Sequence, residues 1–333
     1  MIKLYILSLL SSFGLYFLFL FINKKLKFID QSTWMKNSKK GIPTQFGFFY
    51  IILFCLILYL AFIFGLLDFD RNTIPRPEIF LFALMILSIL SIVDFKYNIH
   101  PFVRLIIQFN TVFISLSTLN IPYLSNYIPY KLEVLIILYF WIYFINCSNF
   151  IDGIDTSLNL FIITIFLNTI LCIYLLNLEK FFFISRTLFL FIVLTCSFIF
   201  FNLPKAKVFA GDSGSIPSGY IIGWLNIFLI FETKKIFIFI ISSYLIMDVT
   251  ITLFKKILKK KVPWARDFDY FFLIPTKYAK KDHIFTLKIL TLNQFILFIL
   301  SVLSLYYYQY FFLILAILSN IMTILYFQKL KNS

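Results

Sequence analysis

The chain has 333 residues, of which 61% are hydrophobic and only 14% are charged, and its mean hydropathy is +0.94. A soluble domain has about 45–50% apolar and about 25% charged residues, so this composition excludes a disordered protein, a fibrous repeat and almost any soluble enzyme. The net charge of +15 is explained by the basic cytoplasmic loops of a membrane protein, and we therefore expect no nucleic-acid partner.

Apolar runs long enough to cross a bilayer follow one another along the chain, since a spanning helix needs about 20 such residues. They predict about eleven transmembrane helices, over residues 2–23, 46–67, 79–93, 102–119, 132–148, 158–178, 182–201, 216–231, 236–254, 289–307 and 311–327. Backbone groups in lipid must be satisfied within each segment, and these lengths suit helices rather than barrel strands. We expect an all-α polytopic helical bundle that forms a single membrane domain over residues 1–333.

Lysine and arginine gather in alternate loops, and cytoplasmic loops carry the excess of both. The pattern predicts that the N-terminus lies outside and the C-terminus lies in the cytoplasm. The predicted cytoplasmic loops cover about 23–45, 94–101, 149–157, 202–215 and 255–288. We interpret the lysine run 255–261 as a charge anchor for topology and lipid headgroups. His100 is interpreted as a local cap and His283 as part of a basic loop, and neither is expected to bind a metal.

Carboxylates collect on this predicted cytoplasmic side. Asp94 follows the third apolar run, Asp152 and Asp155 follow the fifth, and Asp212 precedes the eighth. Acids gathered on one face of a membrane protein indicate a functional site, because burying charge near lipid is costly. Each group also has a structural interpretation, as a helix-end charge, a capped polar turn or a flexible Gly-Ser turn.

Basic residues beside these acids indicate what such a site would bind. Mg²⁺ takes one or two carboxylates and leaves its other positions to phosphate oxygens and water, with Mn²⁺ as the alternative ion. Arg104, Lys205 and Lys207 would neutralise the remaining phosphate charge. The stretch 211–215, at the start of a helix, would add N–H donors and a positive dipole end. The residues therefore predict a Mg²⁺-dependent protein that handles a phosphorylated substrate at the inner membrane surface.

Two longer segments carry a family resemblance. Residues 149–155 read Asn149-Phe-Ile-Asp152-Gly-Ile-Asp155, and residues 201–215 fit the pattern Phe-Asn-x-Pro-x-Ala-Lys-x-Phe-x-Gly-Asp-x-Gly-Ser. In this order they resemble the polyprenyl-phosphate N-acetylhexosamine-1-phosphate transferases, which start lipid-linked bacterial cell-wall and surface polysaccharides. The segments 29–30 and 41–44, together with Gly47, are similar to the family's first cytoplasmic loop. Asp248 resembles a residue in helix nine of the branch that starts O-antigen chains.

The resemblance implies a Mg²⁺-dependent transferase of the bacterial inner membrane, with its active site facing the cytoplasm. It would move a sugar 1-phosphate, expected to be N-acetylhexosamine 1-phosphate, from a UDP-sugar to undecaprenyl or another polyprenyl phosphate and release UMP. The implied partners are these two substrates and the lipid bilayer, with a homodimer left open because relatives often pair.

The resemblance also implies roles for individual residues. The implied catalytic residues are Asp94, Asp152 and Asp212, and the implied metal ligands are Asp212, Asn149 and Asp152. Asp155 would hydrogen-bond the nucleotide base. Phosphate oxygens would be held by Asn202 and Arg104, with Lys205 or Lys207 nearby. Asp94 would lie beside the attacking lipid phosphate, as a base or as an electrostatic guide.

Two departures from the family pattern leave alternatives open. Phe95 stands where the family usually has a second aspartate, and residues 263–270 contain no histidine where the family has a His-rich stretch. One alternative is a degenerate member that binds lipid phosphate without turnover. A separate alternative, which does not depend on these departures, is a membrane transporter, which would place ionisable residues near the bilayer midplane in broken helices.

Overall fold

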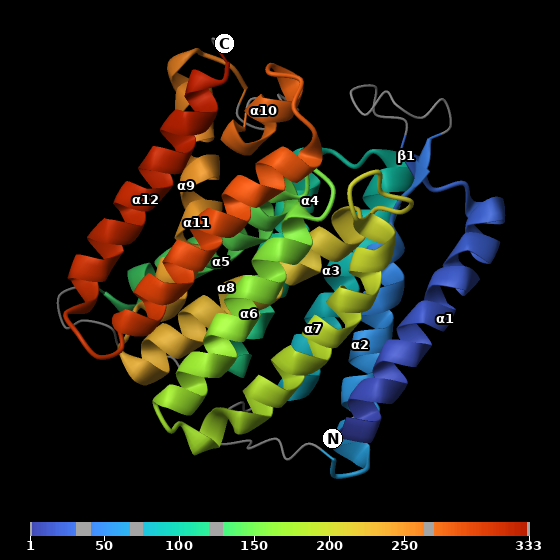
Figure 1. Cartoon of the computed structure of the whole chain (residues 1–333). Helices are drawn as coiled ribbons and strands as arrows, with labels where there is room; N and C mark the ends of the chain where they lie inside the picture. Colours follow the sequence, from blue (N-terminus) through green and yellow to red (C-terminus); the bar gives the residue numbers. More distant parts are fainter. Residues whose placement is uncertain (1, 31–40, 67–75, 120–128, 263–269, 332–333) are drawn as a thin grey trace.

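The computed structural model describes residues 2–30, 41–66, 76–119, 129–262 and 270–331. Within these residues, eleven helices are long and apolar enough to cross a membrane. The predicted all-α polytopic bundle is confirmed, and the chain is a multi-pass membrane protein. The N- and C-termini lie at opposite ends of the bundle (Figure 1). We call the end at which α12 finishes, drawn uppermost in Figure 1, the C-terminal end.

The spanning helices are α1 (Ile2–Leu26), α2 (Phe46–Ile63), α3 (Pro77–Tyr97), α4 (Pro101–Ser115), α5 (Tyr130–Ile151), α6 (Ser157–Leu175), α7 (Phe182–Asn202), α8 (Asp212–Thr233), α9 (Phe237–Leu258), α11 (His283–Leu303) and α12 (Gln309–Lys329). The shorter elements are β1 (Ile29–Asp30), β2 (Ile42–Pro43), η1 (Leu116–Thr118), η2 (Glu179–Phe181), η3 (Phe271–Leu273) and α10 (Ile274–Lys277). The strands β1 and β2 pair antiparallel between α1 and α2.

Several helices begin or end beyond the apolar runs that predict them. α8 begins at Asp212 instead of residue 216, and α3 continues to Tyr97, so Asp94 lies within its last turn. The interpretation of His283 as a loop residue is wrong, because it is the first residue of α11, where Asp282 accepts a hydrogen bond from the main chain of Phe285. Polar helix ends add no hydrophobic signal, although capping side chains stabilise them. The capping role predicted for His100 at the start of α4 is confirmed.

The central helix of the bundle is α8, and nearly all of its residues are buried. It packs against α5, α3 and α2. Glycines allow the closest approaches, because a Cβ on Gly219 would meet the backbone of Ile145 in α5 at 2.7 Å, and one on Gly47 in α2 would collide with the backbone of Gly214. Small residues at such contacts let membrane helices pack tightly. The start of α8 is therefore held where α2, α3 and α5 meet.

The segment that precedes α8 is tied to the start of α2 by main-chain hydrogen bonds. The N–H of Phe209 donates to the carbonyl of Pro43 at 2.9 Å, and the N–H of Gly47 donates to that of Ala210 at 2.9 Å. Buried backbone groups need partners of this kind. The loop between α7 and α8 is thus fixed against the β1–β2 hairpin at the C-terminal end of the bundle.

Candidate active site

An ion pair at the C-terminal end joins α3 to α4. The chain turns back through Asn98, whose φ is 50°, and α4 begins at Pro101. Arg104 consequently faces α3, and its Nη1 lies 2.6 Å from Oδ2 of Asp94 and 4.0 Å from Oδ2 of Asp212. The Asp94 side chain is only 10% exposed and the Arg104 side chain 27%. A guanidinium thus lies between two carboxylates from helices that are far apart in the sequence, and it partly neutralises both.

Asp152 brings a third carboxylate into the same region. It caps the C-terminal end of α5 and is partly buried. Burial raises the pKa of Asp152 well above its ordinary value, and the nearby negative charges of Asp212 and Asp155 raise it further. A cation shared by Asp152 and Asp212 would remove this electrostatic cost.

The donor set at this position fits a shared ion rather than a closed metal cage. Among the described residues, no group of three His, Cys, Asp or Glu side chains could hold a metal ion. Mg²⁺ needs only one or two carboxylates when phosphate oxygens and water complete its coordination. Asn149 lies close to this pair, because its Oδ1 accepts a hydrogen bond of 2.8 Å from the hydroxyl of Ser215, three residues after Asp212. An amide oxygen has two lone pairs, so Oδ1 keeps one for a cation.

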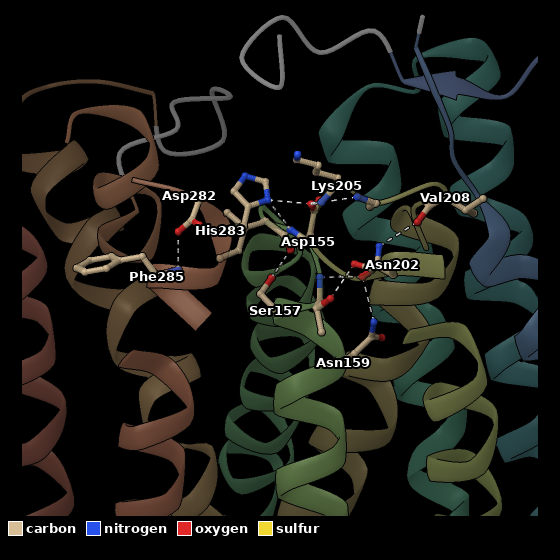
Figure 2. A network of polar contacts seen from close by, with 12 residues as sticks. Asp155, Ser157, Asn159, Asn202, Lys205, Val208, Asp282, His283 and Phe285 are labelled. Carbon is tan, nitrogen blue, oxygen red and sulfur yellow. Dashed lines mark hydrogen bonds and ion pairs between the residues drawn. The ribbon is translucent and has the colours of Figure 1, made fainter. Parts of the chain in front are cut away.

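Asp155 ties three segments together (Figure 2). Its Oδ2 accepts hydrogen bonds from the main-chain N–H groups of Lys205 and Ala206, at 3.1 and 3.2 Å, and lies 3.0 Å from Nδ1 of His283. Its Oδ1 is buried and has no hydrogen-bond partner within the described part of the chain. Such an unpaired buried oxygen is costly, and it is available to a donor on a bound molecule.

Asn202 is bonded into the same network (Figure 2). Its Oδ1 accepts from the main chain of Thr156 at 2.8 Å and from the side chain of Asn159 at 3.1 Å, and its Nδ2 donates to the carbonyl of Val208 at 2.9 Å. These contacts join the start of α6 to the loop between α7 and α8. Each amide nitrogen carries two hydrogens, and within the described residues only one N–H of the Asn202 amide has an acceptor.

The lysines lie at the edge of the site, and the helix N-terminus is used internally. Lys205 and Lys207 are exposed. The main-chain N–H of Ser213 donates to Oε1 of Gln45, and those of Gly214 and Ser215 donate to the carbonyl of Gly211. The expectation that the donors of residues 211–215 face an anion is therefore wrong for these three N–H groups. A buried helix start must satisfy its own donors, and Gln45 does so here.

Two contributors could not be found from sequence motifs. Gln45 belongs to no motif, and His283 comes from a helix start 128 residues after Asp155. Phe95, which stands in place of a second aspartate, is 37% exposed and meets Phe28 edge to face at 5.8 Å. Most of the histidine-free segment 263–270 lies outside the described residues. Its last residue, Tyr270, stacks on Phe150 with a centroid distance of 5.1 Å.

Acids, a guanidinium and amides converge at one end of a helical membrane bundle. The protein is therefore a candidate for a membrane-embedded enzyme. Residues 78–230 match the sequence model of glycosyl transferase family 4. This range runs from α3 to α8 and contains the expected site residues, from Asp94 to Asp212. The chain is also 28% identical, over 259 residues, to a probable undecaprenyl-phosphate N-acetylglucosaminyl 1-phosphate transferase of Bacillus subtilis (strain 168), covering 73% of this chain and 68% of that protein. Both comparisons agree with the resemblance: residues 78–230 are similar to glycosyl transferase family 4, and the chain is similar to a polyprenyl-phosphate sugar-1-phosphate transferase.

Proposed function

We propose that the protein transfers N-acetylhexosamine 1-phosphate from a UDP-sugar to undecaprenyl or another polyprenyl phosphate and releases UMP. The observation that carries the proposal is the placement of Arg104 between Asp94 and Asp212, with Asp152 and Asn149 beside them. Opposite charges arranged in this way bind a diphosphate together with its cation. The relative from Bacillus subtilis, a probable undecaprenyl-phosphate N-acetylglucosaminyl 1-phosphate transferase, supports the same lipid acceptor and the same kind of transferred group.

In the proposed reaction an oxygen of the lipid phosphate attacks the β-phosphorus of the nucleotide sugar. The bond from this phosphorus to the bridging oxygen breaks, and UMP leaves with the electron pair. A lipid phosphate is largely ionised at neutral pH, because its second pKa is about 6, so no strong base is required. Asp94, already paired with Arg104 at 2.6 Å, acts by orienting the guanidinium toward phosphate oxygens.

The remaining groups bind and position the nucleotide sugar. Asp152, Asp212 and Asn149 would hold Mg²⁺, with Mn²⁺ as the alternative, and the ion would neutralise the diphosphate charge. The unpaired Oδ1 of Asp155 is an acceptor for a nucleotide base N–H, and the second N–H of Asn202 is a donor for a phosphate oxygen. Positioning and electrostatics of this kind supply most of the catalysis in phosphoryl transfer.

The proposed location is a bacterial inner membrane with the C-terminal end of the bundle in the cytoplasm. The helix ends at that end carry the lysines of α1, α9 and α12, and cytoplasmic ends of membrane helices are enriched in such residues. Both substrates are accessible there, because nucleotide sugars are cytoplasmic and the lipid phosphate reaches the inner leaflet.

Release of UMP tests the proposal. Purified protein is supplied with undecaprenyl phosphate, a panel of UDP-sugars and Mg²⁺, and then with Mn²⁺ or a chelator. We expect UMP with at least one UDP-N-acetylhexosamine, and a loss of about 10²–10³-fold in Asp212→Asn. The control is Glu232→Gln, which removes an acid whose partner is Lys180, away from the site. Undiminished turnover in Asp212→Asn would remove the metal assignment. For the wild-type protein, substrate binding without any turnover would favour a degenerate member, and substrate flux across the membrane without chemistry would favour a transporter.

A further inference from the structure

A cavity lies among the ends of α9 and α12 and the η3–α10 segment. The helices α9, α10 and α12 reach the C-terminal end of the bundle (Figure 1). The volume of the cavity is about 300 Å³. Of the described residues that line it, five are lysines and none is Asp or Glu. The lysines are Lys255, Lys256, Lys259, Lys261 and Lys331. None of these belongs to the candidate active site.

The walls of this basic cavity are fixed by a buried carboxylate. Asp248 of α9 accepts hydrogen bonds from the main-chain N–H groups of Phe271 and Phe272, at 3.0 and 3.1 Å, and from the hydroxyl of Tyr244 at 3.0 Å. The Asp248 side chain is thereby committed to holding η3 in place. The ammonium group of Lys255 lies 4.2 Å from the centre of the Phe271 ring. Aromatic faces attract ammonium groups, so this lysine is held beside the cavity.

Lys255, Lys259 and Lys331 carry like charges around one cavity and repel one another, and an anion between them removes the repulsion. Lysines are common partners of phosphate groups, to which they present a compact positive charge. An anionic phospholipid presents such a phosphate group at its headgroup, at the depth where lysines at the ends of membrane helices lie.

We propose that this basic cavity is a phosphate-binding site, separate from the candidate active site, and that it takes the phosphate of an anionic lipid headgroup or a free phosphate ion. The inference does not rest on the proposed function. Binding of a phosphate group in the cavity would affect the active-site region through η3. Gly153, between Asp152 and Asp155, packs closely on this segment, because a Cβ on Gly153 would lie 3.0 Å from Leu273 and 3.1 Å from Phe272. A bound phosphate group that stabilises η3 would therefore also stabilise the turn that carries these aspartates.

Binding to the detergent-solubilised full chain tests this site without any measurement of turnover. The probes are phosphatidylglycerol and inorganic phosphate, and the readout is the dependence of the apparent melting temperature on probe concentration. The test variant is Lys255→Gln/Lys259→Gln/Lys331→Gln, in which all three lysines are exposed. The matched control is Lys24→Gln/Lys25→Gln/Lys27→Gln, which removes the same charge at the end of α1.

We expect the test variant to lose about 100-fold in affinity, because each lysine near an anionic headgroup contributes about a factor of five. If it fails to fold, the single change Lys331→Gln should still lose about fivefold. A loss for phosphatidylglycerol identifies a lipid headgroup as the ligand, and a loss for inorganic phosphate alone identifies the free ion. Equal affinity of wild type and test variant for both probes, no response to either probe, or an equal loss in the α1 control would overturn the proposal.

Discussion

Neutralising Asp94 and Arg104 singly and together tests the ion pair at the centre of the candidate active site. With an effective dielectric constant of about 20, the gross attraction is about 6 kcal/mol for this pair at 2.6 Å and about 4 kcal/mol for Arg104 and Asp212 at 4.0 Å. Arg104 is therefore attracted more strongly to Asp94 than to Asp212. Desolvation and the 27% exposure of the Arg104 side chain reduce the net coupling to about 1–3 kcal/mol.

The four proteins of the double-mutant cycle are the wild type, Asp94→Asn, Arg104→Gln and the double variant. Arg104→Gln should be the most destabilising single change, because it leaves Asp94 buried without its partner and near Asp212. The double variant should be no less stable than Arg104→Gln. The free energy of unfolding is measured by titration with sodium dodecyl sulfate in mixed micelles.

A second cycle on Lys180 and Glu232 serves as the control. Their separation is 2.8 Å, but the Lys180 side chain is 53% exposed, so a coupling of no more than about 1 kcal/mol is expected. If the changes at Asp94 and Arg104 are additive within about 0.5 kcal/mol, the two side chains do not interact in the membrane protein. The proposed orientation of the guanidinium by Asp94 would then be refuted.

Three further predictions concern single residues. Asp152→Asn should stabilise the metal-free protein by about 1 kcal/mol while lowering turnover. The raised pKa means that the folded protein holds the Asp152 proton more tightly than the unfolded chain does. Ionisation of Asp152 therefore costs stability as the pH rises above 3.8. The difference in unfolding free energy between variant and wild type should widen from pH 5 to pH 8, and a constant difference would contradict this. His283→Ala should raise KM for the nucleotide sugar several-fold with little change in kcat, because His283 contacts Asp155, and initial rates should recover in His283→Gln, which keeps a donor. Gly47→Ala should prevent stable folding because its Cβ would collide with the first turn of α8. The control Gly14→Ala, whose Cβ would have nothing within 4 Å, should be neutral or stabilising by up to about 1 kcal/mol. Equal yields of monodisperse protein from the two variants would refute the collision.

The number and course of the spanning helices could be predicted from the sequence because the bilayer imposes both a length and an apolar composition on each of them. The helix ends could not be predicted in the same way. α8 begins at Asp212 and α11 at His283, where the residues are polar and hydropathy carries no signal. Their positions depend on tertiary contacts, such as the hydrogen bond from Ser213 to Gln45.

The gathering of acids at one end of the bundle could also be predicted, because alternate helix ends share one face. Their individual partners could not. The ten-residue spacing of Asp94 and Arg104 does not show that the chain turns back at Asn98 and pairs them. The contact of Asp155 with His283 joins residues 128 positions apart, and no periodic pattern marks such a pair. Motifs identify which residues take part, whereas the packing of α3, α4 and α11 determines which of them touch.

The first departure from the family pattern, Phe95, follows Asp94 in the sequence but lies on another face of α3. Residues 94 and 95 are about 100° apart around α3, so Asp94 faces Arg104 while Phe95 lies toward the surface against Phe28. In the proposed reaction, a carboxylate at position 95 would add negative charge where the lipid phosphate approaches. Its replacement by phenylalanine lowers this repulsion, and an ionised phosphate needs little help from a base. In the proposed reaction, the cost of the missing aspartate would therefore be smaller than the loss of an acid–base catalyst, about 10²–10⁴-fold in rate. Catalysis would depend instead on how firmly Arg104 is held.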